Sequence, residues 1–240
     1  MQKISTIIPV INEEDNIFPL AEQILVSIDN YNKELIFIDD GSTDGTKDKI
    51  LELKKKYGDI IIGVFFDRNY GHQAALLSGL KIAKGDYIFT IDGDLQDPPS
   101  NMRRMLNLMK NKNLDIVNTI RKKRPGESFF RINLIYFLYF ISKILRTKII
   151  FNSGDFRLIN KKALQEILKK KNKVFFLRSI VPKINLDQGY YYYNRDIRQK
   201  GLSKCNFIWL IKFAFQAFLA SFHINFFKSY HTNYKISQII

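Results

Sequence analysis

The 240-residue sequence predicts an α/β fold whose first half is a doubly wound sheet. Over the first 120 residues, short apolar runs alternate with segments of helical spacing. The apolar runs are continuous, as in parallel strands that are buried on both faces. Strand–helix alternation of this kind is typical of doubly wound α/β sheets. Hydrophobic residues make up 46% of the chain, which is enough to bury a core and excludes wholesale disorder.

The first half divides into expected strands and helices that follow one another in turn. The expected strands are residues 4–10, 35–38, 60–66, 87–91 and 115–119. Helical spacing between them covers residues 16–28, 46–56, 73–83 and 99–109. Asp15 and Asn16 are candidate caps of the first helix, and the proline pair at 98–99 suits the start of the last.

The second half is less regular. We expect an apolar, aromatic helix over 129–145, a short strand pair around 149–159, a basic helix over 161–170 capped by Asn160, and a strand over 189–194. Four consecutive tyrosines, 190–193, lie on that last strand. Because strand side chains alternate between faces, two of them should pack inward and two should be exposed.

Residues 207–222 read as an apolar, amphipathic helix near the C-terminus. The run is shorter than the roughly 20 residues of a membrane span unless it continues to residue 227. Trp209, several phenylalanines and a narrow polar stripe suit a helix in the membrane interface. A core helix of the domain is the alternative.

The charge is distributed unevenly along the chain. Residues 1–100 hold 10 basic and 17 acidic residues, whereas residues 101–204 hold 25 basic and 6 acidic ones, within a net charge of +15. This asymmetry suggests one half that holds a cation and another that faces polyanions or an anionic membrane. The single cysteine, Cys205, excludes a disulfide framework, and the first residues lack the layout of a secretory signal, so a cytoplasmic setting is expected.

Clusters of acids and amides follow the first four expected strands, at residues 12–15, 39–45, 67–71 and 92–97. Ligands of such sheets bind outside the carboxyl ends of the strands, so these clusters should meet at one site. Asp92 and Asp94 would point the same way if the chain is still extended there, with Gln96 two residues further on. Carboxylates held this close need a cation, and oxygen ligands suit Mg²⁺ or Mn²⁺.

Six segments together resemble the family 2 inverting glycosyltransferases, and within them the polyprenyl-phosphate glycosyltransferases, which include dolichol-phosphate mannose synthase and undecaprenyl-phosphate glucosyltransferases. In order and spacing these segments cover about residues 4–204. They are IIPVINEE (7–14), IDDGSTDGT (38–46), RNYGHQAA (68–75), GDYIFTIDGDLQDPP (85–99), GDFRL (154–158) and RQKGLSK (198–204).

The resemblance implies a GT-A-type doubly wound mixed sheet and a set of site residues. Base and ribose of a UDP- or GDP-linked sugar would be held by Pro9, Asn12, Glu13 and Asp40. Asp92, Asp94 and Gln96 would bind Mg²⁺ or Mn²⁺ on the diphosphate, over which Arg198, Ser203 and Lys204 would close. The acceptor phosphate would meet Arg121 and Arg131, while His72 and Gln73 would line the donor pocket.

Asp155 would lie near the reacting centre, where two roles stay open. A phosphate monoester acceptor is largely dianionic at neutral pH, since its second pKa is about 6, so it needs no strong base. Asp155 would then orient the acceptor or an arginine. A sugar-hydroxyl acceptor would instead require a general base.

The resemblance also divides the chain. Residues 1–204 would be the catalytic domain, with a nucleotide-sugar half (1–120) and an acceptor half (121–204), and residues 205–240 an interfacial helix and tail. Bacterial relatives usually continue into membrane spans. We therefore expect anchoring at the cytoplasmic face of the membrane through the apolar helices, the basic middle segment or a small membrane partner.

Three alternatives to this function stay open, and the sequence disfavours two of them. A saccharide hydroxyl in cell-surface glycan assembly is the alternative acceptor. Nucleic-acid binding is disfavoured by the acidic clusters and by the absence of a known binding motif in the sequence. An inactive scaffold is disfavoured because the Asp92, Asp94 and Gln96 triplet is intact.

Overall fold

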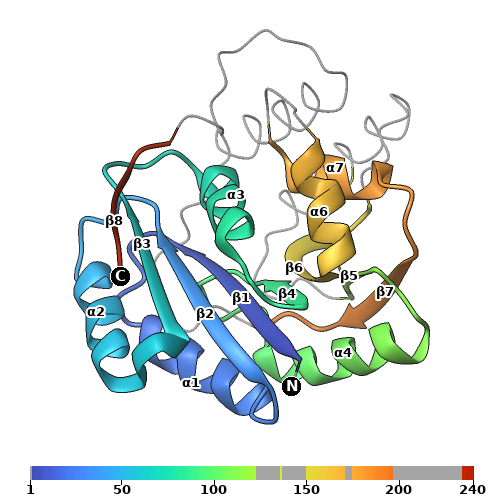
Figure 1. Ribbon diagram of the computed structural model, residues 1–240, viewed down its shortest axis with the longest axis horizontal. Coiled ribbons are helices and arrows are strands. Elements are labelled where there is room, and N and C mark those ends of the chain that lie inside the picture. Colours follow the sequence, from blue (N-terminus) through green and yellow to red (C-terminus); the bar gives the residue numbers. More distant parts are fainter. Residues whose placement is uncertain (1, 123–135, 137–149, 171–174, 197–233) are drawn as a thin grey trace, which may run out of the picture.

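The computed structural model describes residues 2–122, 136, 150–170, 175–196 and 234–240, which form one twisted sheet between two layers of helices (Figure 1). The helices expected over 129–145 and 207–222 lie outside these residues, apart from position 136. Within the described part of the chain, no helix combines the length and the apolar character needed to cross a membrane.

The sheet is mixed, with the described strands in the order β7-β5-β6-β4-β1-β2-β3-β8. β1, β2, β3 and β4 are mutually parallel, β6 runs antiparallel to β4 and β5, and β7 is parallel to β5. The strands are β1 Lys3–Val10, β2 Asn32–Asp39, β3 Ile61–Phe66, β4 Tyr87–Thr90, β5 Ile116–Arg121, β6 Ser153–Asn160, β7 Gln188–Tyr193 and β8 Ile236–Ile239.

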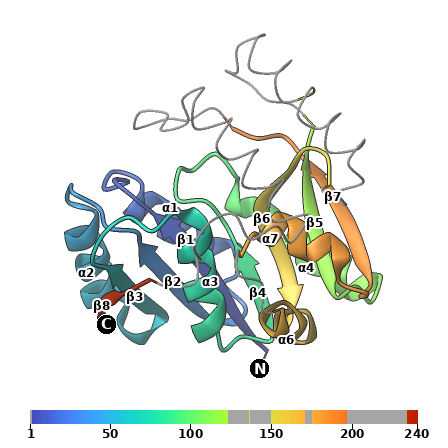
Figure 2. The same cartoon turned by 90° about the horizontal axis from the view of Figure 1, so that it is seen from above.

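Helices cover both faces of the sheet. α1, α2 and α4 lie on one face and α3, α6 and α7 on the other (Figures 1 and 2). Each layer encloses its own apolar core, so the central strands are buried on both sides, as their continuous apolar sequences predict. The helices are α1 Ile17–Ser27, α2 Thr46–Tyr57, α3 His72–Ile82, α4 Met102–Asn111, α6 Lys161–Lys169 and α7 Leu177–Ile180, with short 3₁₀ turns at Gly58–Ile60, Pro99–Asn101 and Val181–Lys183.

The expected doubly wound arrangement is confirmed, with one local difference in the second half. The strand pair expected around 149–159 is a single strand, β6, that pairs antiparallel with both β4 and β5. The tyrosine prediction is correct: Tyr190 and Tyr192 are exposed, whereas Tyr193 is buried and Tyr191 packs against the core.

The sheet gains a strand that the sequence did not predict. β8, part of the expected C-terminal tail, pairs antiparallel with β3, and Tyr234 just before it stacks on Phe66. The four-residue strand is too short to carry a readable period, and the residues that it pairs with lie 170 to 175 positions away in sequence. Only the tertiary fold brings the two together.

The helix caps differ in how they work. Asn160 accepts a hydrogen bond from the Ala163 amide, so it caps α6 as predicted. Asn16 occupies the cap position of α1, but its side chain donates to the Glu13 carboxylate instead of capping the helix. The position was predicted correctly, and the role was not.

A buried carboxylate joins three segments at the amino end of the sheet. Glu34, on β2, is 2% exposed and accepts hydrogen bonds from Ser5 Oγ at 2.6 Å and from the Lys84 amide at 2.8 Å. Lys3 Nζ lies 2.5 Å from its second oxygen. Burial by itself raises the pKa of Glu34, but these donors outweigh burial and lower it.

We predict that Glu34→Gln destabilises the fold by about 1–3 kcal/mol at pH 7, because it removes one member of a buried ion pair. A carboxyl whose pKa falls on folding contributes stability above its unfolded pKa, and this contribution is lost as the pH falls through the folded value. The difference in unfolding free energy between the variant and the unaltered protein, measured by urea unfolding, should therefore shrink below about pH 4. Glu52→Gln, on an exposed helix position, is the matched control. An equal deficit at pH 7 and pH 3 would contradict the assignment.

Candidate active site

The loops after β1 and β2 are joined by hydrogen bonds at the carboxyl edge of the sheet. The Asn12 amide donates to Ser42 Oγ at 2.9 Å, and Asn12 Oδ1 accepts from the Thr43 amide at 2.8 Å. The Glu13 amide donates to Thr46 Oγ1 at 2.8 Å. Pro9 is buried on β1 beside them. The expected donor-binding residues are therefore neighbours, and they shape the two loops.

Asp40 ties the third strand-end loop to the second. Its two carboxylate oxygens accept the backbone amides of Tyr70 and Gly71, at 2.7 and 2.9 Å. Burial raises the pKa of Asp40 to about 6, against the effect of these two donors. Gly41 has φ +72°, and a side chain there would lie 2.4 Å from the Arg68 backbone, so only glycine fits this approach of the loops.

Asp92 and Asp94 follow β4 in a turn and not in the extended chain that their spacing suggested. The turn runs over residues 93–94, and Leu95 has φ +57°. The two carboxylates nevertheless lie close enough that one arginine approaches both. Burial, and next the charge of Asp92, raises the pKa of Asp94 to about 6. The expected repulsion between close carboxylates is therefore present.

Asp97, in the same loop, is the most enclosed acid of the site. It is fully buried and accepts hydrogen bonds from the Tyr193 hydroxyl and from Arg195 Nε at 3.1 Å, while Arg121 Nη2 lies at 3.5 Å. Burial opposes ionisation, but the two guanidinium groups outweigh it and lower the pKa of Asp97. This residue links the loop after β4 to β5 and to the end of β7.

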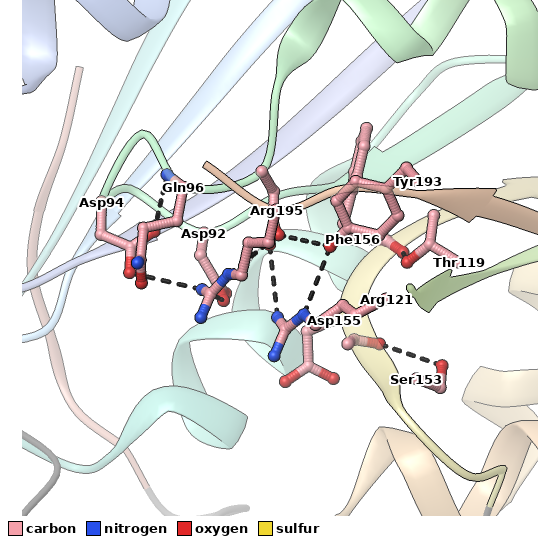
Figure 3. Close-up of polar contacts among 12 residues, drawn as sticks. Asp92, Asp94, Gln96, Thr119, Arg121, Ser153, Asp155, Phe156, Tyr193 and Arg195 are labelled. Carbon is pink, nitrogen blue, oxygen red and sulfur yellow. Dashed lines mark hydrogen bonds and ion pairs between the residues drawn. The ribbon is translucent and has the colours of Figure 1, made fainter. Parts of the chain in front are cut away.

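Arg195 joins the three aspartates. Besides its bond to Asp97, its Nη2 lies 3.4 Å from Asp94 Oδ2 and 3.7 Å from Asp92 Oδ2 (Figure 3). Gln96 fastens the same loop to the neighbouring chain: its carbonyl accepts the Asp196 amide at 2.9 Å, and its side-chain Nε2 donates to the Asp196 carbonyl at 3.3 Å. The Gln96 side chain, expected as a metal ligand, therefore also holds the chain next to Arg195.

Arg121, expected to receive the acceptor phosphate, is 7% exposed at the end of β5. Its partners are Asp97 and the Tyr193 hydroxyl, which Nε approaches to 3.3 Å. Burial disfavours its charge, yet Asp97 outweighs burial and raises its pKa. A Cβ at Gly154 would lie 2.6 Å from Arg121 Nη2, so a larger residue there would have to displace the Arg121 guanidinium.

Asp155 is held in place on β6 by an arginine and a histidine. Arg178, on α7, donates to both of its oxygens at 3.0 and 2.9 Å, and His72 Nε2 lies 3.1 Å from Oδ2. Burial opposes ionisation, but Arg178 and His72 outweigh it and lower the pKa of Asp155 well below its usual value. For His72, burial opposes protonation, but Asp155 and Asp92 outweigh it and raise the pKa. Of the two roles left open, this contact set suits an orienting group.

The acidic cluster has the chemistry of a divalent-cation site. Asp92 Oδ1 is buried and accepts no hydrogen bond from the described residues, and His72 Nε2 lies 3.5 Å from it. His72, Asp92 and Asp155 offer ligand atoms that lie within 4.8 Å of one another. Because both Asp155 oxygens already contact Arg178, the oxygens of Asp92 and Asp94 suit Mg²⁺ or Mn²⁺ better.

Four expected site residues, Arg131, Arg198, Ser203 and Lys204, lie outside the described residues.

Sequence reasoning missed Asp97, Tyr193, Arg195 and Arg178 as site residues. Asp97 belongs to the quoted DLQDPP run, and Arg195 precedes Arg198 by three positions, so both motifs held a signal. Arg178 stands in no motif, and only the fold brings it to Asp155.

The glycosyl transferase family 2 model matches residues 5–168. The uncharacterized glycosyltransferase YkcC of Bacillus subtilis (strain 168) is 34% identical over 206 residues, which cover 83% of this chain and 62% of YkcC. YkoT of the same strain, also an uncharacterized glycosyltransferase, is 31% identical over 92% of this chain and 68% of its own length. An undecaprenyl-phosphate 4-deoxy-4-formamido-L-arabinose transferase of Aeromonas hydrophila is 38% identical over 53% of this chain and 39% of its own length.

Solved structures share the fold. Glucosyl-3-phosphoglycerate synthase from Mycobacterium tuberculosis, solved with Mn²⁺, UDP and glucosyl-3-phosphoglycerate, has a TM-score of 0.57 and 19% identity over 91% of this chain and 77% of its own. Mannosyl-3-phosphoglycerate synthase from Rubrobacter xylanophilus has a TM-score of 0.56 and 14% identity, over 91% of this chain and 72% of its own. The predicted GT-A-type fold is confirmed. With its family model matched over residues 5–168, the chain belongs to glycosyl transferase family 2.

Proposed function

We propose that the protein transfers a sugar from a UDP- or GDP-linked donor to a polyprenyl phosphate, with inversion, at the cytoplasmic face of the membrane. The observation that carries this proposal is the aspartate cluster after β4, at the carboxyl edge of a GT-A-type sheet. The lipid acceptor is supported by relatives named undecaprenyl-phosphate transferases and by the RQKGLSK and GDFRL segments.

The donor would lie across the ends of β1, β2 and β4. Pro9, Asn12, Glu13 and Asp40 would hold the base and ribose, and the aspartates after β4 lie along the same edge of the sheet. Arg198, Ser203 and Lys204 would contact the diphosphate. The family motif supports these last three roles.

Asp92 and Asp94 would hold Mg²⁺ or Mn²⁺. Such an ion, when bound, neutralises the charge that develops on the departing nucleoside diphosphate. Two observations support this assignment: a buried oxygen of Asp92 accepts no hydrogen bond from the described residues, and burial and the charge of Asp92 raise the pKa of Asp94. Gln96 would complete the ligand set.

The contacts of Asp155 favour a phosphate acceptor over a saccharide hydroxyl. Both of its oxygens are engaged by Arg178, which leaves it poorly suited to remove a proton. A dianionic phosphate needs no such base. In this proposal Asp155 orients Arg178 and His72, while Arg121 and Arg131 supply positive charge for the acceptor.

Anchoring would follow from the basic residues of the middle segment, the apolar segment at 207–227, or a small membrane partner. Each basic residue near anionic lipid contributes about 1 kcal/mol, so several together would suffice.

We predict that Asp94→Asn lowers turnover at least about 100-fold, because the cation loses a charged ligand. The assay screens UDP- and GDP-sugars with a short-chain polyprenyl phosphate and Mn²⁺, and excess EDTA should abolish transfer by the unaltered protein. Asp59→Asn, a fully exposed position, controls for loss of one charge and should be active. Full-speed transfer in EDTA would refute the proposed metal dependence.

Asp155→Asn should slow turnover while the acid limb of the kcat–pH profile stays where it is, because the carboxylate orients neighbours and takes no proton. If Asp155 were the base, the variant would lose that limb. Circular dichroism melting should accompany the kinetics, since Arg178 loses its buried partner.

Arg131→Ala should raise the KM for polyprenyl phosphate about tenfold or more and leave the KM for the nucleotide-sugar nearly unchanged. Arg103→Ala, at an exposed position on α4, is the control. An equal loss with a soluble saccharide acceptor would contradict the role assigned to Arg131.

A further inference from the structure

We propose that Arg195 makes cation binding depend on the diphosphate: its guanidinium weakens binding of the cation to the free protein and strengthens binding of the nucleoside diphosphate once the cation is present. This inference rests on the proposed function, because it concerns the same cation. It assigns a positioning role to a residue that neither the motifs nor the comparisons singled out.

The first support is where the guanidinium lies. Its Nη2 lies 3.4 Å from Asp94 Oδ2 and 3.7 Å from Asp92 Oδ2. Its positive charge therefore already partly neutralises the two carboxylates that a divalent cation would bind. Figure 3 shows this group turned toward Asp92 and Asp94. The side chain is 15% exposed, so solvent screens it only partly.

The second support is that other contacts hold Arg195 in place, so its guanidinium cannot easily move away from Asp92 and Asp94. Its Nε bonds the fully buried Asp97 at 3.1 Å, and Asp97 is itself fixed by Tyr193 and Arg121. The backbone at Asp196 is fastened to Gln96 in both directions. A cation at Asp92 and Asp94 would therefore share the site with Arg195.

The third support is the charge balance. Apart from His72, which lies 3.5 Å from Asp92, three aspartates face two arginines, Arg121 and Arg195, so these five side chains carry one net negative charge. A divalent cation would reverse the sign, and repulsion between it and a guanidinium a few ångströms away corresponds to more than a factor of ten in affinity. A diphosphate would restore the balance, since it is attracted by both positive groups.

The test compares the full chain with Arg195→Gln, which removes the charge and keeps a polar group near Asp97. Calorimetry measures Mn²⁺ binding without nucleotide, and then UDP or GDP binding in saturating Mn²⁺. We expect Mn²⁺ to bind the variant about tenfold tighter and the nucleoside diphosphate about tenfold weaker. Arg195→Lys should restore both toward the unaltered values, and Arg103→Gln, an exposed arginine paired with Asp29, should change neither.

If Arg195 had only a structural role, its substitution would weaken binding of both Mn²⁺ and the nucleoside diphosphate. Changes of opposite sign in the two affinities therefore distinguish the proposed role from a structural one. Unchanged Mn²⁺ affinity in Arg195→Gln, or a parallel loss of both ligands in a variant that melts normally, would overturn the inference alone. If the unaltered protein binds no Mn²⁺ with or without nucleotide, and transfers sugar in EDTA, both this inference and the proposed metal dependence fail.

Discussion

The buried carboxylate of Asp97 is the interaction on which the rest of the site depends. It connects the loop after β4 with β5 through Arg121 and with the end of β7 through Tyr193 and Arg195. A fully buried charge is costly unless it is paired and hydrogen-bonded, so the three partners must stay in place together. Segments separated by about 100 residues are thereby held in one arrangement beneath Asp92 and Asp94.

A second buried acid, Asp155, holds several elements together on the other side of the site. Asp155 holds Arg178 from α7 and His72 from the start of α3, so three elements meet at one carboxylate. The contacts around Asp97 and those around Asp155 meet at Asp92, whose carboxylate lies 3.5 Å from His72. The site therefore contains acids in two settings. Asp97 and Asp155 are almost fully buried and hold arginines in place, whereas Asp92 and Asp94 are partly exposed and share the single guanidinium of Arg195.

Much of this was predictable from the sequence because it is local. The apolar runs of the central strands and the polar residues directly after them identify the sheet and its carboxyl edge. The Asn160 cap and the alternation at Tyr190–Tyr193 were also correct. Position in a motif did not fix a side chain's partner: Arg121 pairs with Asp97, and the Gln96 amide binds the chain at Asp196.

The sequence by itself determined the family, the layered α/β fold and the loops in which the acids stand, because periodicity and motif spacing act over a few residues. Only the tertiary structure determined which basic side chain pairs with which carboxylate. It also determined that β8 pairs with β3 at the edge of the sheet. Ion pairs and strand pairing depend on distance in space, and their partners here lie 23 to 175 residues apart. Burial then determines the strength of each ion pair, and the burial of a side chain cannot be read from a local sequence pattern.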